Sequence, residues 1–140
     1  MSFTDIELEY LATQRLGRLA TVQPNGTLQV SPVGFVYNAS TKTIDIGGFR
    51  MATSRKFRNV ADNGRVAFVV DDIASIQPWR VRCVEIRGHG EAITAPTDSA
   101  VSAPGIDGAI IRIHPKRIIS FGIDDLDTDA HDLVPNKRDV

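Results

Sequence analysis

The hydrophobic and polar positions along the chain form short apolar segments separated by turn residues. Leu16–Val22 and Leu28–Tyr37 flank Pro24-Asn25-Gly26, and an Asn-Gly step between apolar segments predicts a hairpin turn. Thr43–Gly47 follows as a third strand. Arg65–Asp71 is apolar at consecutive positions, which is typical of a central strand buried on both faces.

The clearest alternation lies in Val81–Ala92 and predicts a long strand. One face carries Val84, Ile86, Gly88, Gly90 and Ala92, and the other carries Glu85, Arg87, His89 and Glu91. Two glycines in one long strand favour a bend of the kind found in barrels. Pro32, in the return strand of the hairpin, indicates a bulge or an unpaired edge position because proline lacks an N–H donor.

After the long strand, Thr94–Gly108 is rich in small residues, proline and glycine and is expected to be a loop. Two short strands should follow, Ala109–His114 and Arg117–Gly122, with a break at Pro115. We expect the acidic chain after residue 123 to bury little. The sequence thus divides into a folded domain over residues 1–123 and an acidic C-terminal tail over residues 124–140.

Two helices are predicted from their capping residues. Thr4-Asp5-Ile6-Glu7 has the spacing of a capping box and predicts a helix over Asp5–Gln14. Thr53 or Ser54 caps a second helix that ends at Asn63, where the following glycine stops it. With six or seven strands joined by short turns, these elements predict a mainly β fold: an antiparallel sheet that closes into a β-barrel with flanking helices.

Composition and charge exclude several classes of protein. With 42% hydrophobic and 24% charged residues, the 140-residue chain has an ordinary globular composition. It lacks the roughly 18 consecutive apolar residues of a membrane span, and no signal peptide is visible. The single cysteine, Cys83, fits a reducing compartment, so we expect a cytoplasmic protein. A net charge of −1 argues against a nucleic-acid partner.

The basic residues nevertheless gather in two places. One cluster consists of Arg50, Arg55, Lys56 and Arg58, and the second of Arg80, Arg82 and Arg87. Local clusters in a chain without net positive charge suit one small anion better than a polymer. The alternative is that both are solvated faces.

Familiar catalytic motifs are absent. There is no G-x-G-x-x-G, no G-x-x-x-x-G-K-[ST] and no G-x-S-x-G. Cys83 and His89 lie about 20 Å apart along one strand, too far to share a metal, so no metal site is predicted. No side chain is assigned a catalytic role, and any redox chemistry would have to come from a cofactor.

One segment has the features of a phosphate site. Gly47-Gly48 ends a strand, and Ser54, Arg55 and Lys56 stand at the start of the second helix. A helix N-terminus offers free N–H groups and a partial positive charge, to which these side chains add a hydroxyl and two cations. The alternative is an ordinary capped surface helix.

Several stretches together resemble the split β-barrel flavin and deazaflavin oxidoreductases, the pyridoxamine-phosphate-oxidase-like superfamily, and within it the small actinobacterial branch that uses the deazaflavin coenzyme F420. The matching stretches are Gln14–Thr21, Pro32–Phe35, Asp45–Gly48, Ser54–Val60, Arg65–Asp72, Pro78–Arg82, Glu85–Gly88 and Ile111–Arg117. Their order and spacing, rather than any one of them, carry the resemblance, which extends from about residue 3 to residue 123.

The resemblance implies an FMN-binding split barrel that forms a homodimer with cofactors at the subunit interface. It implies cofactor-binding roles for Pro32, Val33, Gly34, Gly47, Gly48, Arg50, Ser54, Arg55, Lys56, Asn59, Trp79, Arg80 and Arg82. Lys56 and Ser54 would hold the phosphate, and the neighbouring subunit would offer Trp79, Arg80 and Arg82. The glutamyl tail of F420 would engage arginines near Arg50 and Arg80.

Three functions follow as hypotheses. The first is an F420-dependent oxidoreductase that transfers a hydride between the cofactor and a small organic substrate. The second is an FMN-dependent enzyme of the pyridoxamine-phosphate-oxidase type, which would leave the additional arginines unused. The third is a non-catalytic protein that binds a cofactor or haem. The sequence names no substrate, because the pockets of such folds are mostly apolar and shaped by loops.

Overall fold

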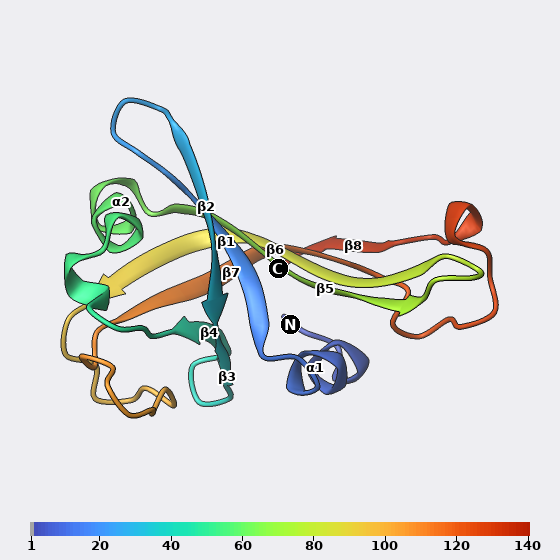
Figure 1. The fold of residues 1–140 in the computed structure, drawn as a ribbon, viewed down its shortest axis with the longest axis horizontal. Helices are drawn as coiled ribbons and strands as arrows, with labels where there is room; N and C mark the ends of the chain where they lie inside the picture. The colour runs from blue at the N-terminus through green and yellow to red at the C-terminus, as the bar shows by residue number, and fades with distance from the viewer. Residues whose placement is uncertain (1) are drawn as a thin grey trace.

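The computed structural model describes residues 2–140 and shows one antiparallel sheet with two short helices (Figure 1). The strands are β1 (Leu16–Val22), β2 (Leu28–Gly34), β3 (Val36–Asn38), β4 (Thr43–Ile46), β5 (Arg65–Ser75), β6 (Arg80–Ile93), β7 (Ile110–Phe121) and β8 (Asn136–Asp139). The helices are α1 (Asp5–Ala12) and α2 (Arg55–Asn63), with 3-10 turns η1 (Met51–Thr53) and η2 (Ala130–Asp132). In residues 2–140 no helix is long and apolar enough to cross a membrane.

The order of the strands explains the curl of the sheet. Neighbouring strands follow the order β2-β1-β5-β6-β7-β4-β3, and β8 pairs with β7. β2 and β3 lie at opposite ends of this path, yet only Phe35 separates them along the chain. The sheet therefore curls into a half-barrel whose edges are joined at Phe35, and the mainly β split-barrel prediction is confirmed. The far ends of β5 and β6 project with β8 and η2 as an arm that points away from α2 (Figure 1).

The N-terminal half follows the sequence prediction closely. β1 has the predicted bounds, and the turn after it contains Gly26 at φ 88°, a left-handed conformation that suits glycine. β2 ends at Gly34 rather than Tyr37, because the chain crosses to the other sheet edge there. Pro32 lies on this edge strand, as predicted.

Both helices begin at the predicted caps. Thr4 and Glu7 form a reciprocal capping box at α1, which ends at Ala12, two residues earlier than expected. Ser54 caps α2, and Gly64 terminates it at φ 68°.

The prediction of two strands broken at Pro115 was wrong. β7 is continuous through Pro115, because a β-bulge absorbs the irregularity. Gly88 pairs with Pro115 and Arg87 pairs with Arg117, which leaves Lys116 without a partner on β6. A Cβ at Gly88 would lie 2.2 Å from the backbone oxygen of His114, so the close approach of β6 and β7 requires glycine here.

Aliphatic side chains from the inner face of the curled sheet form the core, and α2 covers one end of it. The largest fully buried hydrophobic side chains are Leu19, Ile44, Ile46, Met51, Phe68, Val70, Ile86, Ile110, Ile111, Ile113 and Ile118. α2 contributes the buried Phe57 and Val60, and each such side chain stabilises the fold by roughly 1.5–3 kcal/mol. This packing fixes the start of α2 against the sheet.

The C-terminal tail buries little, as expected, because none of residues 124–140 is buried, but it contains the strand β8. Its Arg138 donates hydrogen bonds to both carboxylate oxygens of Glu7, which is fully buried, and Ser120 donates a third bond at 2.6 Å. Burial alone would raise the pKa of Glu7, but the hydrogen bonds from Arg138, Ser120 and the Thr4 N–H outweigh it and lower the pKa. The tail therefore contains a strand that is tied to α1 by a buried ion pair.

We predict that Arg138→Ala lowers the free energy of unfolding by about 3 kcal/mol at pH 7, because it leaves the buried Glu7 carboxylate without its counter-charge. Arg117→Ala is the matched control: its pair with Asp139 also joins β7 to β8 but is exposed, so its loss should cost about 0.5 kcal/mol or less. Urea unfolding of both variants measures the difference.

The loss of unfolding free energy in Arg138→Ala should depend on pH. The Glu7 pKa is depressed in the folded protein, so its stabilising contribution is present above the ordinary value of 4.5 and disappears as the pH falls through the lower folded pKa. The gap between wild type and Arg138→Ala should therefore shrink in acid. Equal losses for Arg138→Ala and Arg117→Ala at pH 7 would contradict the structural role of the buried pair.

Candidate functional site

A cleft of about 650 Å³ opens where the two edges of the sheet meet. Its walls come from β2, β3, the end of β4, the start of α2 and the loop over residues 94–108. The lining residues are Gln14, Arg15, Pro32, Val33, Gly34, Phe35, Val36, Gly47, Gly48, Phe49, Met51, Lys56, Val101, Ser102, Ala103 and Ile106. The cleft is thus mostly apolar, with polar groups at few points, as is typical of sites for small organic molecules.

Two glycines leave space in the wall of this cleft. A Cβ at Gly34 would meet no atom nearer than 3.8 Å, and one at Gly48 none nearer than 3.6 Å. Neither glycine has a positive φ, so the folding of this chain does not itself require glycine at either position. Both expose backbone to the cleft, where a flat ligand can approach closely. At Gly47 the space is already filled, because a Cβ there would lie 2.5 Å from the Val101 side chain.

Lys56 is the cation of the cleft, and α2 positions it. It stands in the first turn of the helix, half-buried, and its ammonium has no hydrogen bond or ion pair with any residue of the described part of the chain. Ser54 is engaged in the local fold: its hydroxyl donates to the Met51 carbonyl at 2.7 Å and accepts from the Phe57 N–H. Lys56 and the helix N-terminus together form a place for an anion.

Two carboxylates hold the loop that covers the cleft. Asp98 pairs with Arg112, which is also paired with the fully buried Asp45. Asp107 accepts a hydrogen bond from the Ala52 N–H at 3.0 Å. The hydrogen bonds that Arg112 donates to Asp45 raise the pKa of Arg112, so its charge is permanent, while Arg112 lowers the pKa of Asp98. With both ends anchored, the middle of the loop lies over the cleft.

The structure places only some of the predicted residues in this cleft. Those that line it are Pro32, Val33, Gly34, Gly47, Gly48 and Lys56. Arg50 and Arg55 are exposed nearby in the chain but do not line it. Asn59 is buried and donates to the Thr21 hydroxyl at 3.1 Å, so it holds α2 against β1.

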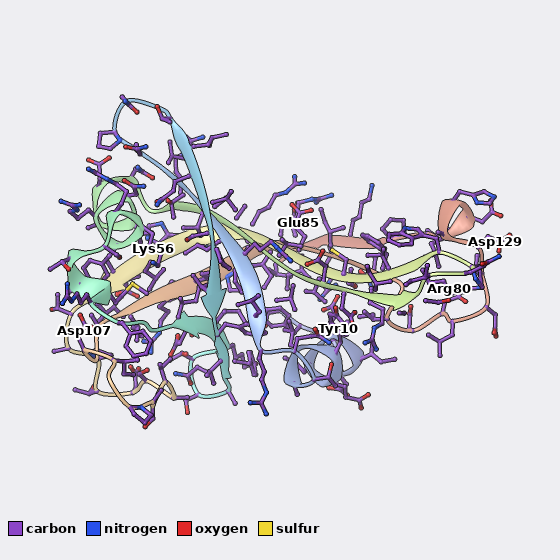
Figure 2. The ribbon with its side chains drawn as sticks, in the orientation of Figure 1. Tyr10, Lys56, Arg80, Glu85, Asp107 and Asp129 are labelled. Atoms are coloured by element: carbon purple, nitrogen blue, oxygen red, sulfur yellow. The ribbon has the colours of Figure 1, made fainter. Side chains whose placement is uncertain are left out.

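Trp79, Arg80 and Arg82 do not line the cleft of their own chain. Lys56 and Arg80 stand at opposite ends of the molecule (Figure 2), whereas Arg82 is nearer, because its partner Asp72 accepts a hydrogen bond from the cleft residue Gln14 at 3.4 Å. Arg80 donates to backbone carbonyls of the C-terminal segment. Arg82 forms a bidentate pair with Asp72, whose pKa this pair lowers, and stacks over the Tyr10 ring at 5.1 Å. Trp79 is half-exposed. Within one protomer, these side chains do not reach a ligand at Lys56.

Sequence reasoning missed two parts of the cleft. The loop residues Val101, Ser102, Ala103 and Ile106 carry no motif, and their position depends on the long-range contacts of Asp98 and Asp107. Gln14 and Arg15, between α1 and β1, also line the cleft. Both residues begin Gln14–Thr21, the first of the stretches that resemble the family. That resemblance is the one signal in the sequence that could have indicated them.

We predict that Gly34→Ala and Gly48→Ala keep the thermal stability of the wild type but weaken the binding of a flavin-type cofactor by about tenfold, because the methyl group occupies ligand space. Gly88→Ala is the contrasting variant and should be strongly destabilised, because its Cβ would clash with backbone. Thermal melts and titrations with FMN and F420 separate the two effects. Unchanged affinity in both cleft variants would show that the ligand lies elsewhere.

Comparisons with known proteins agree with this architecture. A reductase of Streptomyces rimosus, which acts on 5a,11a-dehydrotetracycline and 5a,11a-dehydrooxytetracycline, is 48% identical over 132 residues, covering 94% of this chain and 92% of that protein. Among solved structures, the conserved hypothetical protein Rv2991 from Mycobacterium tuberculosis has a TM-score of 0.68 at 19% identity and covers 90% of this chain and 89% of its own.

A further solved structure, an FAD binding protein from Mycobacterium smegmatis, has a TM-score of 0.63 at 20% identity and covers 83% of this chain and 92% of its own. At these identities, both solved structures show a shared fold. Residues 4–120, which include α1, the whole cleft and β1 to β7 almost to its end, match the pyridoxamine 5'-phosphate oxidase family. The chain belongs to the pyridoxamine 5'-phosphate oxidase family.

Proposed function

We propose that this protein is an oxidoreductase that binds F420 in the cleft and reduces a carbon–carbon double bond of a polycyclic organic substrate. One observation carries the proposal: an apolar cleft lined by glycine backbone, with an unpaired lysine at a helix N-terminus, occurs in a chain 48% identical to a dehydrotetracycline reductase. The cofactor, when bound, supplies the hydride. The chain itself binds and orients the reactants.

The residues of the cleft divide this task between them. Lys56 and the first turn of α2 hold the cofactor phosphate through charge-assisted hydrogen bonds. The exposed backbone at Gly34 and Gly48 accepts the flat ring. Phe49 and the anchored loop, through Val101, cover the apolar side of the cleft and limit the access of water.

Reduction of a double bond also consumes a proton. Among the described residues that line the cleft there is no Asp, Glu, His, Cys or Tyr. Cys83 lies outside the cleft, and burial raises the pKa of its thiol to about 12, so it is not a reactive group. Water therefore supplies the proton in this proposal, and Gln14 and Arg15 are the polar groups that can orient a substrate oxygen.

F420 is preferred to FMN because of the exposed Arg50 and Arg55, which are close in the chain to the proposed phosphate-binding residue Lys56 and suit a polyanionic tail. FMN ends at its phosphate and would need only Lys56. The contacts of Arg80 and Arg82 within the chain favour FMN, since these two cations are already engaged. FMN is therefore the second candidate.

The exposed apolar residues support a homodimer. Leu28 and Val30, on the outer face of the edge strand β2, are 76% and 67% exposed, and Trp79 at the tip of the arm is 54% exposed. Leu28 and Val30 lie on β2 and Trp79 lies apart from them on the arm, and exposed apolar side chains at two places on a small protein favour coverage by another subunit. In a twofold dimer with cofactors at the interface, the arm of one subunit would reach the cleft of the other, so that Trp79 and Arg80 could complete the site.

We predict that Lys56→Ala weakens F420 binding about thirtyfold, equivalent to ~2 kcal/mol, because a charge-assisted phosphate contact is lost. Arg58→Ala, an exposed cation further along α2, is the matched control and should change affinity less than twofold. Fluorescence titration measures binding, and oxidation of reduced F420 with a dehydrotetracycline measures activity. Unchanged affinity and turnover in Lys56→Ala would contradict the proposed site.

We predict a dimer of twice the 15.3 kDa chain mass by light scattering at micromolar concentration. Val30→Asp should convert it into a monomer with weakened cofactor binding, because it places a charge in the interface. Val134→Asp, at a more exposed valine of the C-terminal segment, should remain dimeric. A wild-type monomer would contradict a cofactor site shared between subunits.

A further inference from the structure

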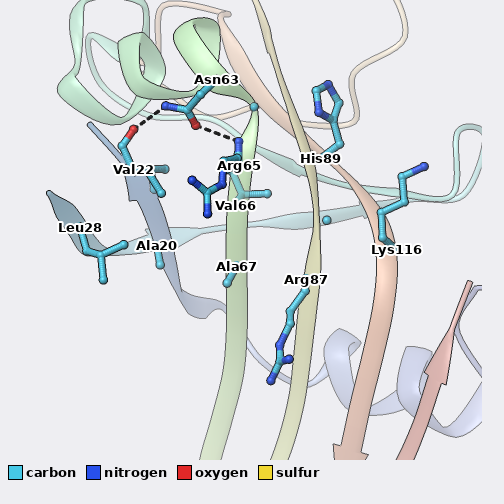
Figure 3. Close-up of a pocket in the computed structure, with 13 residues that line it drawn as sticks. Ala20, Val22, Leu28, Asn63, Arg65, Val66, Ala67, Arg87, His89 and Lys116 are labelled. Carbon is cyan, nitrogen blue, oxygen red and sulfur yellow. Dashed lines mark hydrogen bonds between the residues drawn. The ribbon is translucent and has the colours of Figure 1, made fainter. Parts of the chain in front are cut away.

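The inner face of β5 continues beyond the core with an acidic residue. Its core residues alternate along that face as far as the buried Val70, and Asp72 is the next residue of the same alternation. On the outer face, Ala67 lines a hollow of about 430 Å³ (Figure 3) together with Leu28, which belongs to the surface proposed for contact with a second subunit. Asp72 therefore lies on the opposite side of the sheet from that surface, beneath α1.

Asp72 is held there by two partners. It accepts a hydrogen bond from the buried Tyr10 hydroxyl at 2.9 Å and forms the bidentate pair with Arg82, its cross-strand partner. The hydrogen bonds from Arg82 are the main cause of the lowered pKa of Asp72, while burial and the hydrogen bond to Asp72 raise the pKa of Tyr10. Asp72 thus stays ionised and can only accept hydrogen bonds.

The surroundings of Gln14 determine which end of its side-chain amide is free. The amide nitrogen donates to the Thr13 hydroxyl at 3.2 Å and to Asp72 at 3.4 Å. The Thr13 hydroxyl donates its only proton to the Tyr10 carbonyl at 2.7 Å, so it can only accept from Gln14. Both neighbours therefore require the NH₂ group, and the amide oxygen is left without a partner among residues 2–140.

Gln14 stands at the junction of two spaces. It lines the cleft, and with Phe35 and Val36 it also lines an adjoining pocket of about 360 Å³ between α1 and β3. Apart from Gln14, the described residues that line this pocket are hydrophobic or aromatic, and Lys56, which is proposed to hold the cofactor phosphate, is not one of them. The amide oxygen therefore belongs to the part of the cleft where a polycyclic substrate can extend beyond the cofactor.

We propose that Asp72 is a positioning residue that holds the Gln14 amide so that its oxygen accepts a hydrogen bond from a hydroxyl group of the substrate. Arg15, an exposed cation that also lines the cleft, can donate to the same hydroxyl oxygen. A phenol or enol hydroxyl satisfies both groups, whereas its methyl ether leaves the Gln14 oxygen without a donor. The inference rests on the proposed function, because it takes the cleft as the substrate site, and it adds the functional group that the substrate must carry.

Calorimetric titrations with 2-hydroxyanthraquinone and 2-methoxyanthraquinone, in the presence and absence of F420, test this inference. We expect the wild type to bind the hydroxyl probe about tenfold more tightly than the methyl ether. Gln14→Leu should abolish this preference, and Asp72→Asn should reduce it to about threefold or less, because asparagine can also donate and lets the Gln14 amide rotate. Asp139→Asn, at an exposed Asp–Arg pair outside the cleft, is the matched control and should keep the full preference.

A double-mutant cycle separates positioning from a structural role. If Asp72 acts through Gln14, adding Asp72→Asn to Gln14→Leu should weaken binding of the hydroxyl probe no further, whereas independent structural damage would add to the loss. Additive losses, or equal affinity of the wild type for both probes, would overturn the proposal. Weaker F420 binding in Gln14→Leu would overturn it as well, because the amide oxygen would then contact the cofactor.

The same titrations distinguish this inference from the proposed function. Unchanged F420 affinity in Lys56→Ala would contradict the proposed cofactor site, yet a preference for the hydroxyl probe that depends on Gln14 would still support the assignment of the amide oxygen. Conversely, normal F420 binding without that preference would overturn only the role of Gln14 and Asp72.

Discussion

The connection between β2 and β3 is the constraint on which the functional architecture depends. These strands lie at opposite ends of the hydrogen-bonded path, yet one residue, Phe35, joins them. The chain can satisfy both conditions only if the sheet curls until its edges meet. The cleft lies at this junction, with Gly34 on one side and Gly48 on the other, so the same constraint that closes the fold also creates the space for a ligand.

A buried ionic cluster holds the loop that covers the cleft. Arg112 and Asp45 are both buried, and a charge taken out of water is tolerated only when partners satisfy it. Asp98, from the covering loop, and Asn38, which donates to Asp45 at 2.9 Å, complete the cluster. The loop is therefore held by the requirements of a buried guanidinium rather than by its own sequence.

Local patterns predicted most of the elements. The alternation of Val81–Ala92, the Asn-Gly turn and the Ser54 cap each depend on residues close in the chain, and each is present in the structure. The predicted break at Pro115 was wrong because a bulge in β7, with Lys116 as the extra residue, keeps the strand paired on both sides of the irregularity. The buried pair of Glu7 and Arg138 spans 131 residues, so no local pattern could indicate it.

The residues of the candidate site were predictable about as far as the strands and helices were, because here too only local patterns can be recognised in the sequence. The motif residues Pro32–Gly34, Gly47-Gly48 and Lys56 converge on the cleft because they lie on rigid elements with recognisable ends. Val101 and Ile106 reach it only through the contacts that anchor their loop. The role of the arm depends on a second subunit, which is why the contribution of Arg80 remains a proposal.

The identity of the cofactor is the central claim, and paired titrations with F420 and FMN at low and high salt test it most directly. The account predicts at least tenfold tighter binding of F420, a difference of 1.4 kcal/mol. This advantage should narrow as salt rises, because it arises from solvent-exposed contacts of arginines such as Arg50 and Arg55 with the anionic tail. Tighter binding of FMN at both salt concentrations would contradict it and identify the protein as an FMN enzyme of the same family.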